Sequence, residues 1–130
     1  MAEFVSVLIT TYNEEINIED CLASCVNWAS EIFVVDSYST DDTLEIARNY
    51  GASIVQHEYE SPSAQKNWAL DNLPFGNEWV LILDADERLV PELRSELSYI
   101  VSRDGNGYDG YHVNTRRVAG PDYTSSNRTL

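Results

Sequence analysis

The chain has 130 residues and a formal net charge of −14, because 22 acidic side chains outnumber 8 basic ones. Its hydrophobic content of 43% is that of a globular domain and excludes a disordered chain. The negative charge repels phosphate backbones, so no nucleic acid is expected as a partner, and an anionic small substrate would need a bridging cation. No apolar run approaches the roughly 20 residues of a membrane span, and the first apolar stretch is expected to be a strand rather than a signal peptide.

Apolar runs of strand length alternate along the chain with helical patterns. Strands are expected at residues 5–10, 31–36, 53–56, 78–84 and 110–116. Helices are expected within residues 18–29, 37–51, 60–73 and 90–101, from helical spacing of apolar side chains or from capping residues. The alternation predicts a three-layer α/β domain, in which helices cover both faces of a mostly parallel sheet.

Local signals predict where two of the helices begin or end. Ser39 or Thr40 is expected to cap the second helix, and Gly51 is expected to end it. Ser61 is expected to cap the third helix, with Pro62 at its first position.

The two cysteines, Cys21 and Cys25, lie four residues apart on one face of the first predicted helix. Two cysteines without a nearby histidine do not make a zinc site. We therefore expect two reduced thiols packed in the core.

Polar side chains gather where the predicted strands end. The first strand is followed by Thr11, Tyr12, Asn13 and Glu14, the second by Asp36, Ser37 and Asp41, and the fourth by Asp84 and Asp86. In parallel α/β sheets, ligands bind at the carboxyl ends of the strands. A solvated loop explains any one of these clusters, but three acidic clusters at one sheet edge favour a binding site.

Asp84 and Asp86 have the spacing that puts alternate side chains of a strand on one face. Mg²⁺ and Mn²⁺ typically take one or two carboxylates from a protein and leave positions for phosphate oxygens. Such an ion would also stabilise the charge of a departing nucleoside diphosphate. Lys66 would add a positive charge, although an exposed helix lysine is an equal alternative. Glu87 and Arg88 are expected to form a local surface pair.

Four segments in order, "SVLITTYNEE", "EIFVVDSYSTDDTLEIA", "SAQKNWAL" and "WVLILDADERL", resemble family 2 glycosyltransferases with a GT-A fold. The resemblance extends to about Val113, and four ordered motifs are far more specific than a lone DxD. The last three segments are most similar to bacterial enzymes of lipopolysaccharide core and envelope polysaccharide synthesis. This resemblance implies a cytoplasmic location, with peripheral attachment at the inner membrane face as an option.

The resemblance implies roles for the residues after the first two strands. Thr11 and Glu14 would lie against the nucleotide, with Tyr12 beside the base. Asp36 would hydrogen-bond the nucleobase, and Ser37 would shape the loop around it. UDP is the expected nucleotide, because an acid at the position of Asp36 often meets uracil in this family.

The remaining site residues are carried over in the same way. Asp41 would shape the nucleobase loop, and Lys66 would lie near the nucleotide or diphosphate. Asp84 would be the first acid of the DxD motif, near the ribose and the metal. Asp86 would be the direct ligand of Mn²⁺ or Mg²⁺.

The implied reaction transfers a sugar from a nucleoside-diphosphate sugar to a saccharide or glycolipid acceptor, with inversion. A carboxylate beyond the DxD motif would deprotonate the acceptor, but none of the later acids Asp104, Asp109 and Asp122 has the expected context. We expect residues 1–115 to form the donor-binding domain and residues 116–130 to be a polar tail, the start of an incomplete acceptor half. The apolar face left exposed would favour self-association.

Other classes of protein share parts of this pattern. A catalytically silent nucleotide-sugar-binding module differs only in lacking the base and the acceptor site, so the sequence leaves it open. A receiver domain would need a lysine ending the last strand, whereas Lys66 lies in a helix pattern. A DxD phosphatase would carry the motif on its first strand, and a dinucleotide site would need glycines where "TTYNEE" has none.

Overall fold

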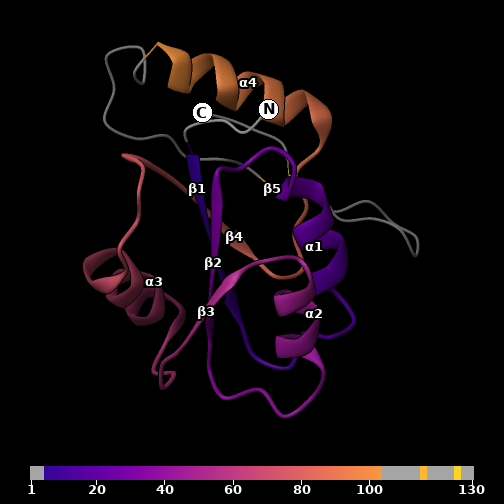
Figure 1. Cartoon of the computed structure of the whole chain (residues 1–130), viewed down its shortest axis with the longest axis vertical. Coiled ribbons are helices and arrows are strands. Elements are labelled where there is room, and N and C mark those ends of the chain that lie inside the picture. Colours follow the sequence, from indigo (N-terminus) through magenta and orange to yellow (C-terminus); the bar gives the residue numbers. More distant parts are fainter. Residues whose placement is uncertain (1–4, 104–114, 117–124, 127–130) are drawn as a thin grey trace.

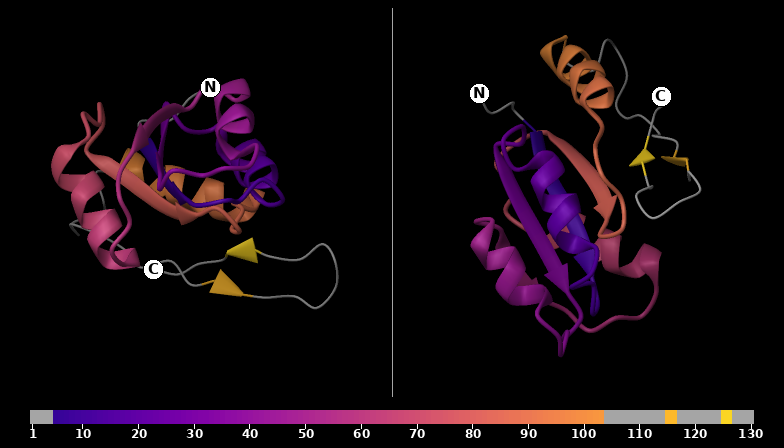
Figure 2. Two further views of the ribbon diagram at one scale, coloured as in Figure 1. Left: turned by 90° about the horizontal axis from the view of Figure 1, so that it is seen from below. Right: turned by 90° about the vertical axis from the view of Figure 1, so that its right-hand side faces the viewer.

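The computed structural model describes residues 5–103, 115–116 and 125–126. Its elements are β1 (Val5–Thr11), α1 (Ile18–Cys25), β2 (Glu31–Asp36), α2 (Thr43–Asn49), β3 (Ser53–Gln56), α3 (Pro62–Asn72), β4 (Trp79–Asp84), α4 (Pro91–Ser102), β5 (Thr115–Arg116) and β6 (Ser125–Ser126). Strands β1 to β4 form one parallel sheet in the order β3-β2-β1-β4. Helices α1 and α2 lie on one side of this sheet and α3 lies on the other (Figures 1 and 2). The expected three-layer α/β fold is confirmed.

The central strand β1 is buried on both faces, which explains its continuous apolar sequence. Val7 and Ile9 belong to a core cluster shared with α1 and α4. Leu8 points to the other face, where it joins Ala69 of α3 in a second cluster. Apolar side chains on both faces suit the position of β1 inside the sheet, between β2 and β4.

The cysteines lie in the larger of these clusters. Cys21 and Cys25 are free thiols with fully buried side chains on the inner face of α1. Burial raises the pKa of both thiols, that of Cys25 to about 12. The expectation of two reduced core thiols is confirmed.

Several element ends differ from the expected ones. Strand β1 continues one residue further, to Thr11. Helix α1 ends at Cys25, so the buried Ala29 lies beyond it. The expected cap of α2 at Ser39 or Thr40 is wrong, because the helix begins at Thr43.

The other two predicted helix ends are confirmed. Gly51 follows α2 with φ of +80°, in the left-handed conformation that ends helices and suits glycine. The Ser61 hydroxyl caps α3 by accepting a 3.1 Å hydrogen bond from the Ala64 amide, and Pro62 is the first helical residue.

The predicted fifth strand lies partly outside the described residues, which omit 110–114. Its last two residues form β5, which pairs antiparallel with β6 in a separate small sheet. Two residues of the expected polar loop, Ser125 and Ser126, are therefore in a strand. Within the described ranges, no helix has the length and apolar character needed to cross a bilayer.

Candidate functional site

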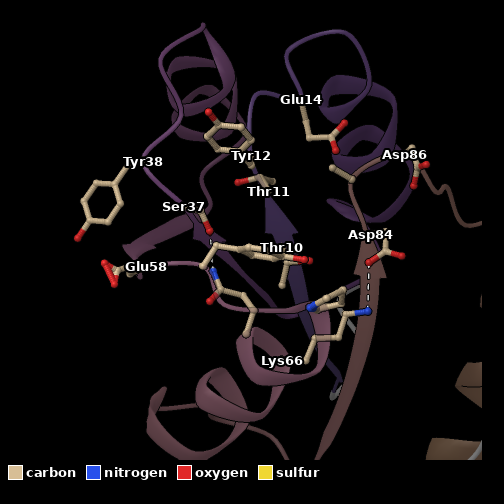
Figure 3. A pocket seen from close by; sticks show the side chains of 14 residues that line it. Thr10, Thr11, Tyr12, Glu14, Ser37, Tyr38, Glu58, Lys66, Asp84 and Asp86 are labelled. Carbon is tan, nitrogen blue, oxygen red and sulfur yellow. Dashed lines mark hydrogen bonds and ion pairs between the residues drawn. The ribbon is translucent and has the colours of Figure 1, made fainter.

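A cavity of about 630 Å³ opens at the carboxyl ends of the parallel strands, within the size range of small-molecule sites. Its lining comes from the ends of β1, β2 and β4, the segment after β3, and α3: Thr10, Thr11, Tyr12, Glu14, Ser37, Tyr38, Glu58, Tyr59, Pro62, Gln65, Lys66, Asp84, Ala85 and Asp86 (Figure 3). Seven of the nine predicted site residues are among these. Asp36 and Asp41 are the exceptions. Both form hydrogen bonds within the segments that carry the lining residues.

One side of the cavity carries charge. Asp84 is the last residue of β4, while Asp86 follows in a turn, so the two are not on one strand face as expected. The Lys66 ammonium reaches from α3 to within 3.2 Å of the Asp84 carboxylate (Figure 3). The Asp86 side chain is exposed and accepts no hydrogen bond from any described residue.

Glu87 holds the turn that carries these carboxylates. Its side chain accepts a 2.8 Å hydrogen bond from the Asp84 amide, and its own amide donates to the Asp84 carbonyl. Burial raises the pKa of Glu87, and the charges of Asp84 and Asp86 add to the increase. The neighbouring Arg88 lies 3.7 Å from Asp20 of α1, so the residues expected to pair locally each have a partner elsewhere.

A divalent cation is compatible with this side of the cavity. Among the described residues no group of three His, Cys, Asp or Glu side chains surrounds a common point. Asp84 and Asp86 nevertheless match the small number of carboxylates that Mg²⁺ or Mn²⁺ takes from a protein when phosphate oxygens complete its coordination. Asp84 already contacts one cation on this side of the cavity, the Lys66 ammonium.

Asp36 is fully buried at the end of β2. Its carboxylate accepts a 2.6 Å hydrogen bond from the Thr11 hydroxyl and further bonds from the amide and hydroxyl of Ser39. These bonds join the ends of β1 and β2, from which Tyr12 and Ser37 enter the cavity. They also explain the wrong helix cap, because the Ser39 hydroxyl is engaged by Asp36.

Hydrogen bonds from backbone amides of one loop to side chains of the other hold together the loops after β1 and β2. We call this set, made of residues 13–15 and 39–43, the loop clasp. Its bonds run from the Asn13 amide to Ser39, from the Thr40 amide to Asn13, from the Glu14 amide to Thr43, from the Glu15 amide to Asp41, and from the Asp42 amide to Glu15. Asp41 also accepts bonds from the amide and hydroxyl of Thr43. Burial raises the pKa of Asp41, but these hydrogen bonds outweigh burial and lower the pKa overall.

Gln65 was missed by the sequence reading, because a glutamine in a helix is usually exposed. It is buried, and its amide nitrogen donates a 3.0 Å hydrogen bond to the Ser37 hydroxyl. Its oxygen lies 2.8 Å from Nδ1 of His57, a ring that stacks on Trp68. Gln65 therefore fixes Ser37 and the segment after β3 against α3.

Three tyrosines also belong to the lining of the cavity. Tyr12, Tyr38 and Tyr59 line the cavity and keep more than half of their surface exposed. Tyr38 and Glu58 lie across the cavity from Asp84 and Asp86 (Figure 3). The sequence assigns a role only to Tyr12, because Tyr38 lies inside a quoted segment without an implied role and Tyr59 lies outside all four segments.

Comparisons with known proteins agree with this architecture. The model of "Glycosyl transferase family 2" matches residues 6–128. An uncharacterised glycosyltransferase of Rickettsia typhi is 38% identical over 110 residues, covering 84% of this chain and 37% of that protein. The chain thus spans little more than a third of the length of the curated relatives it matches.

Two solved structures are similar in fold. Staphylococcus aureus TarS 1–349 is 27% identical, with a TM-score of 0.68 over 91% of this chain and 37% of that one. Glucosyl-3-phosphoglycerate synthase from Mycobacterium tuberculosis, in complex with Mn²⁺, UDP and glucosyl-3-phosphoglycerate, is 22% identical, with a TM-score of 0.60 over 81% of this chain and 40% of that one. The second likeness concerns the fold alone. From the family match over nearly its whole length, the chain belongs to glycosyl transferase family 2.

Proposed function

We propose that this chain binds the donor of an inverting glycosyltransferase, which moves a sugar from UDP to a saccharide or glycolipid acceptor. The observation that carries the proposal is one cavity in which Asp84, Asp86 and Lys66 lie across from Tyr38, with further exposed tyrosines in its lining. A nucleoside diphosphate has the matching chemistry, with a charged end and a flat aromatic end. TarS, 26% identical in this comparison, has been solved in complex with UDP-GlcNAc.

Mn²⁺ or Mg²⁺ is proposed as cofactor, held by Asp86 and Asp84. When bound, the cation would offset the diphosphate charge and ease departure of UDP. Lys66 adds a compact positive charge 3.2 Å from Asp84 and would contact the diphosphate. Glu87 keeps the turn in place through the Asp84 amide, so that both carboxylates face the cavity.

The nucleoside would lie toward β1 and β2, against Thr11, Tyr12, Glu14 and Ser37. Asp36 is proposed to bond the nucleobase through an oxygen that now accepts from Thr11 or Ser39. Binding would then exchange one buried hydrogen bond for another, at small net cost. Asp41 would act on the nucleobase only through the loop clasp.

No catalytic base is proposed, since Asp104, Asp109 and Asp122 lie outside the described residues. Residues 1–115 remain our proposed donor-binding domain. The motif resemblance supports three further proposals. They are an acceptor from the bacterial envelope, a cytoplasmic location, and peripheral contact with the inner membrane face. Self-association is also proposed. Its basis is that β4 is an edge strand of the four-stranded sheet and most of its apolar side chains are only partly buried.

Calorimetric titration with UDP tests the donor site, first with Mn²⁺ and then with a chelator. We expect metal-dependent binding, weakened at least about tenfold in Asp86→Asn, which is 1.4 kcal/mol at 25 °C. Asp71→Asn is the matched control, because it removes the same charge from an exposed position on α3 outside the cavity. A folded chain that binds neither UDP nor a UDP-sugar would refute the proposal.

A catalytically silent binding module is the second candidate, since the described residues contain no identified base. It predicts the same UDP binding but no release of UDP from a UDP-sugar in the presence of acceptor. Turnover measured by UDP release, with Asp86→Asn as the negative control, separates the two functions.

A further inference from the structure

Tyr38 combines a strained backbone with a solvent-exposed ring. Its φ is +60°, a left-handed conformation that glycine adopts freely and that residues with a Cβ disfavour. Such strain persists where the surroundings enforce it, and it clusters at ligand sites. A glycine would adopt this conformation without strain, so the presence of a tyrosine needs an explanation based on its side chain.

The neighbouring bonds hold the backbone but do not need the ring. The Tyr38 amide donates a 2.7 Å hydrogen bond to the Gln56 side chain, and the next residue, Ser39, donates to Asp36. Glycine could make the same backbone bonds without strain. Tyr38 as a whole is 62% exposed, so core packing does not account for its ring either.

The position of the ring indicates which part of a ligand it would meet. In the strand order β3-β2-β1-β4, the end of β2 lies two strand spacings, about 10 Å, from the end of β4. Glu58 shares the Tyr38 side of the cavity and repels phosphate, whereas Lys66 lies with Asp84 on the opposite side (Figure 3). The Tyr38 side thus suits a flat group without negative charge.

We infer that Tyr38 is a donor-binding residue, whose ring packs against the nucleobase of the bound donor. The inference rests on the proposed nucleotide site and adds a residue to which the motif resemblance assigns no role. Tyr12 and Tyr59 line the same cavity and are 58% and 53% exposed, so Tyr38 is one of three exposed tyrosines in its lining. Stacking of flat rings is favourable beyond the apolar area that it buries.

Two substitutions separate the ring from the backbone strain. Tyr38→Gly removes both, whereas Tyr38→Ala removes the ring and keeps a Cβ in the left-handed conformation. We expect both variants to bind UDP roughly fivefold to tenfold more weakly than the unchanged chain. We also expect Tyr38→Gly to melt about 2–5 °C above Tyr38→Ala. Tyr99→Ala is the control, because Tyr99 is 56% exposed on α4 and outside the cavity.

A spectroscopic measurement tests contact with the base directly. Protons H5 and H6 of uracil should shift upfield on binding to the unchanged chain, through the ring current of a stacked tyrosine. The shift should be smaller in both Tyr38 variants and unchanged in Tyr99→Ala.

Three results would overturn the inference. If the unchanged chain binds no UDP, the inference falls together with the proposed donor site. If the chain binds UDP but both Tyr38 variants match it in affinity and proton shifts, the inference alone falls. If Tyr38→Ala is as stable as Tyr38→Gly, the position is not strained and the reason for a tyrosine there disappears.

Discussion

Replacing Asp36 should destabilise the fold through its hydrogen bonds. The buried carboxylate accepts three of them, from the Thr11 hydroxyl and from the hydroxyl and amide of Ser39. At about 1.5 kcal/mol for each bond to a charged group, Asp36→Ala should lower the free energy of unfolding by about 3–5 kcal/mol. That is a large part of the roughly 5–15 kcal/mol that stabilises a typical domain.

Asp36→Asn should cost less, about 1–2 kcal/mol, because only the charge is lost. The Asn oxygen can still accept from the Ser39 amide, while the hydroxyls of Thr11 and Ser39 rotate to accept from its nitrogen. Asp42→Ala is the matched control, since this exposed acid is near in sequence and its side chain makes no capping bond. It should change stability by less than about 0.5 kcal/mol.

Urea denaturation followed by tryptophan fluorescence measures these differences. The midpoint should fall in the order Asp42→Ala, Asp36→Asn, Asp36→Ala, while the denaturant slope stays constant. An Asp36→Ala variant as stable as Asp42→Ala would show that these three bonds contribute nothing net, and the account of how the ends of β1 and β2 are joined would be wrong.

Further predictions concern a helix cap, a loop carboxylate and a thiol. Ser61→Ala should lower stability by about 1 kcal/mol in thermal melts, whereas Ser63→Ala, at an exposed position in the same turn, should not. The folded-state pKa of Asp41 is lowered, so its stabilisation is complete above about pH 4 and is lost as pH falls through that pKa. The stability difference between the unchanged chain and Asp41→Asn should therefore shrink in acid, and a difference that grows there would contradict this sign. Cys25, with its pKa raised to about 12, should resist alkylation at pH 8 until urea unfolds the chain, and fast labelling of the native chain would show that it is accessible.

The sequence was sufficient to predict the elements whose signal is local. The continuous apolar run of β1 and the alternation of strands with helices determine a parallel sheet covered on both faces, because only such a sheet buries strands of this kind. Ser61 and Gly51 were predicted from side-chain and backbone chemistry that acts within a few residues. The acids at the strand ends were found because each directly follows a strand that the sequence predicts, and parallel strands end at the same edge of the sheet.

What the sequence could not decide depends on contacts between distant segments. Ser39 resembles a helix cap in sequence, but its hydroxyl donates to the nearby Asp36 and accepts from the amide of Asn13, which folding brings from the loop after β1. Gln65 resembles a surface residue, yet packing of α3 on the sheet buries it against Ser37. The strain at Tyr38 has no local signature either.

The sequence by itself therefore determined the layers, the family and the acids at the strand ends, since each follows from periodicity, from ordered motifs or from residues close along the chain. Only the tertiary structure decided which side chains are buried behind the cavity and which form its surface. The physical reason is that a polar side chain takes whatever partner the fold places within about 3 Å, and that partner can come from any part of the chain.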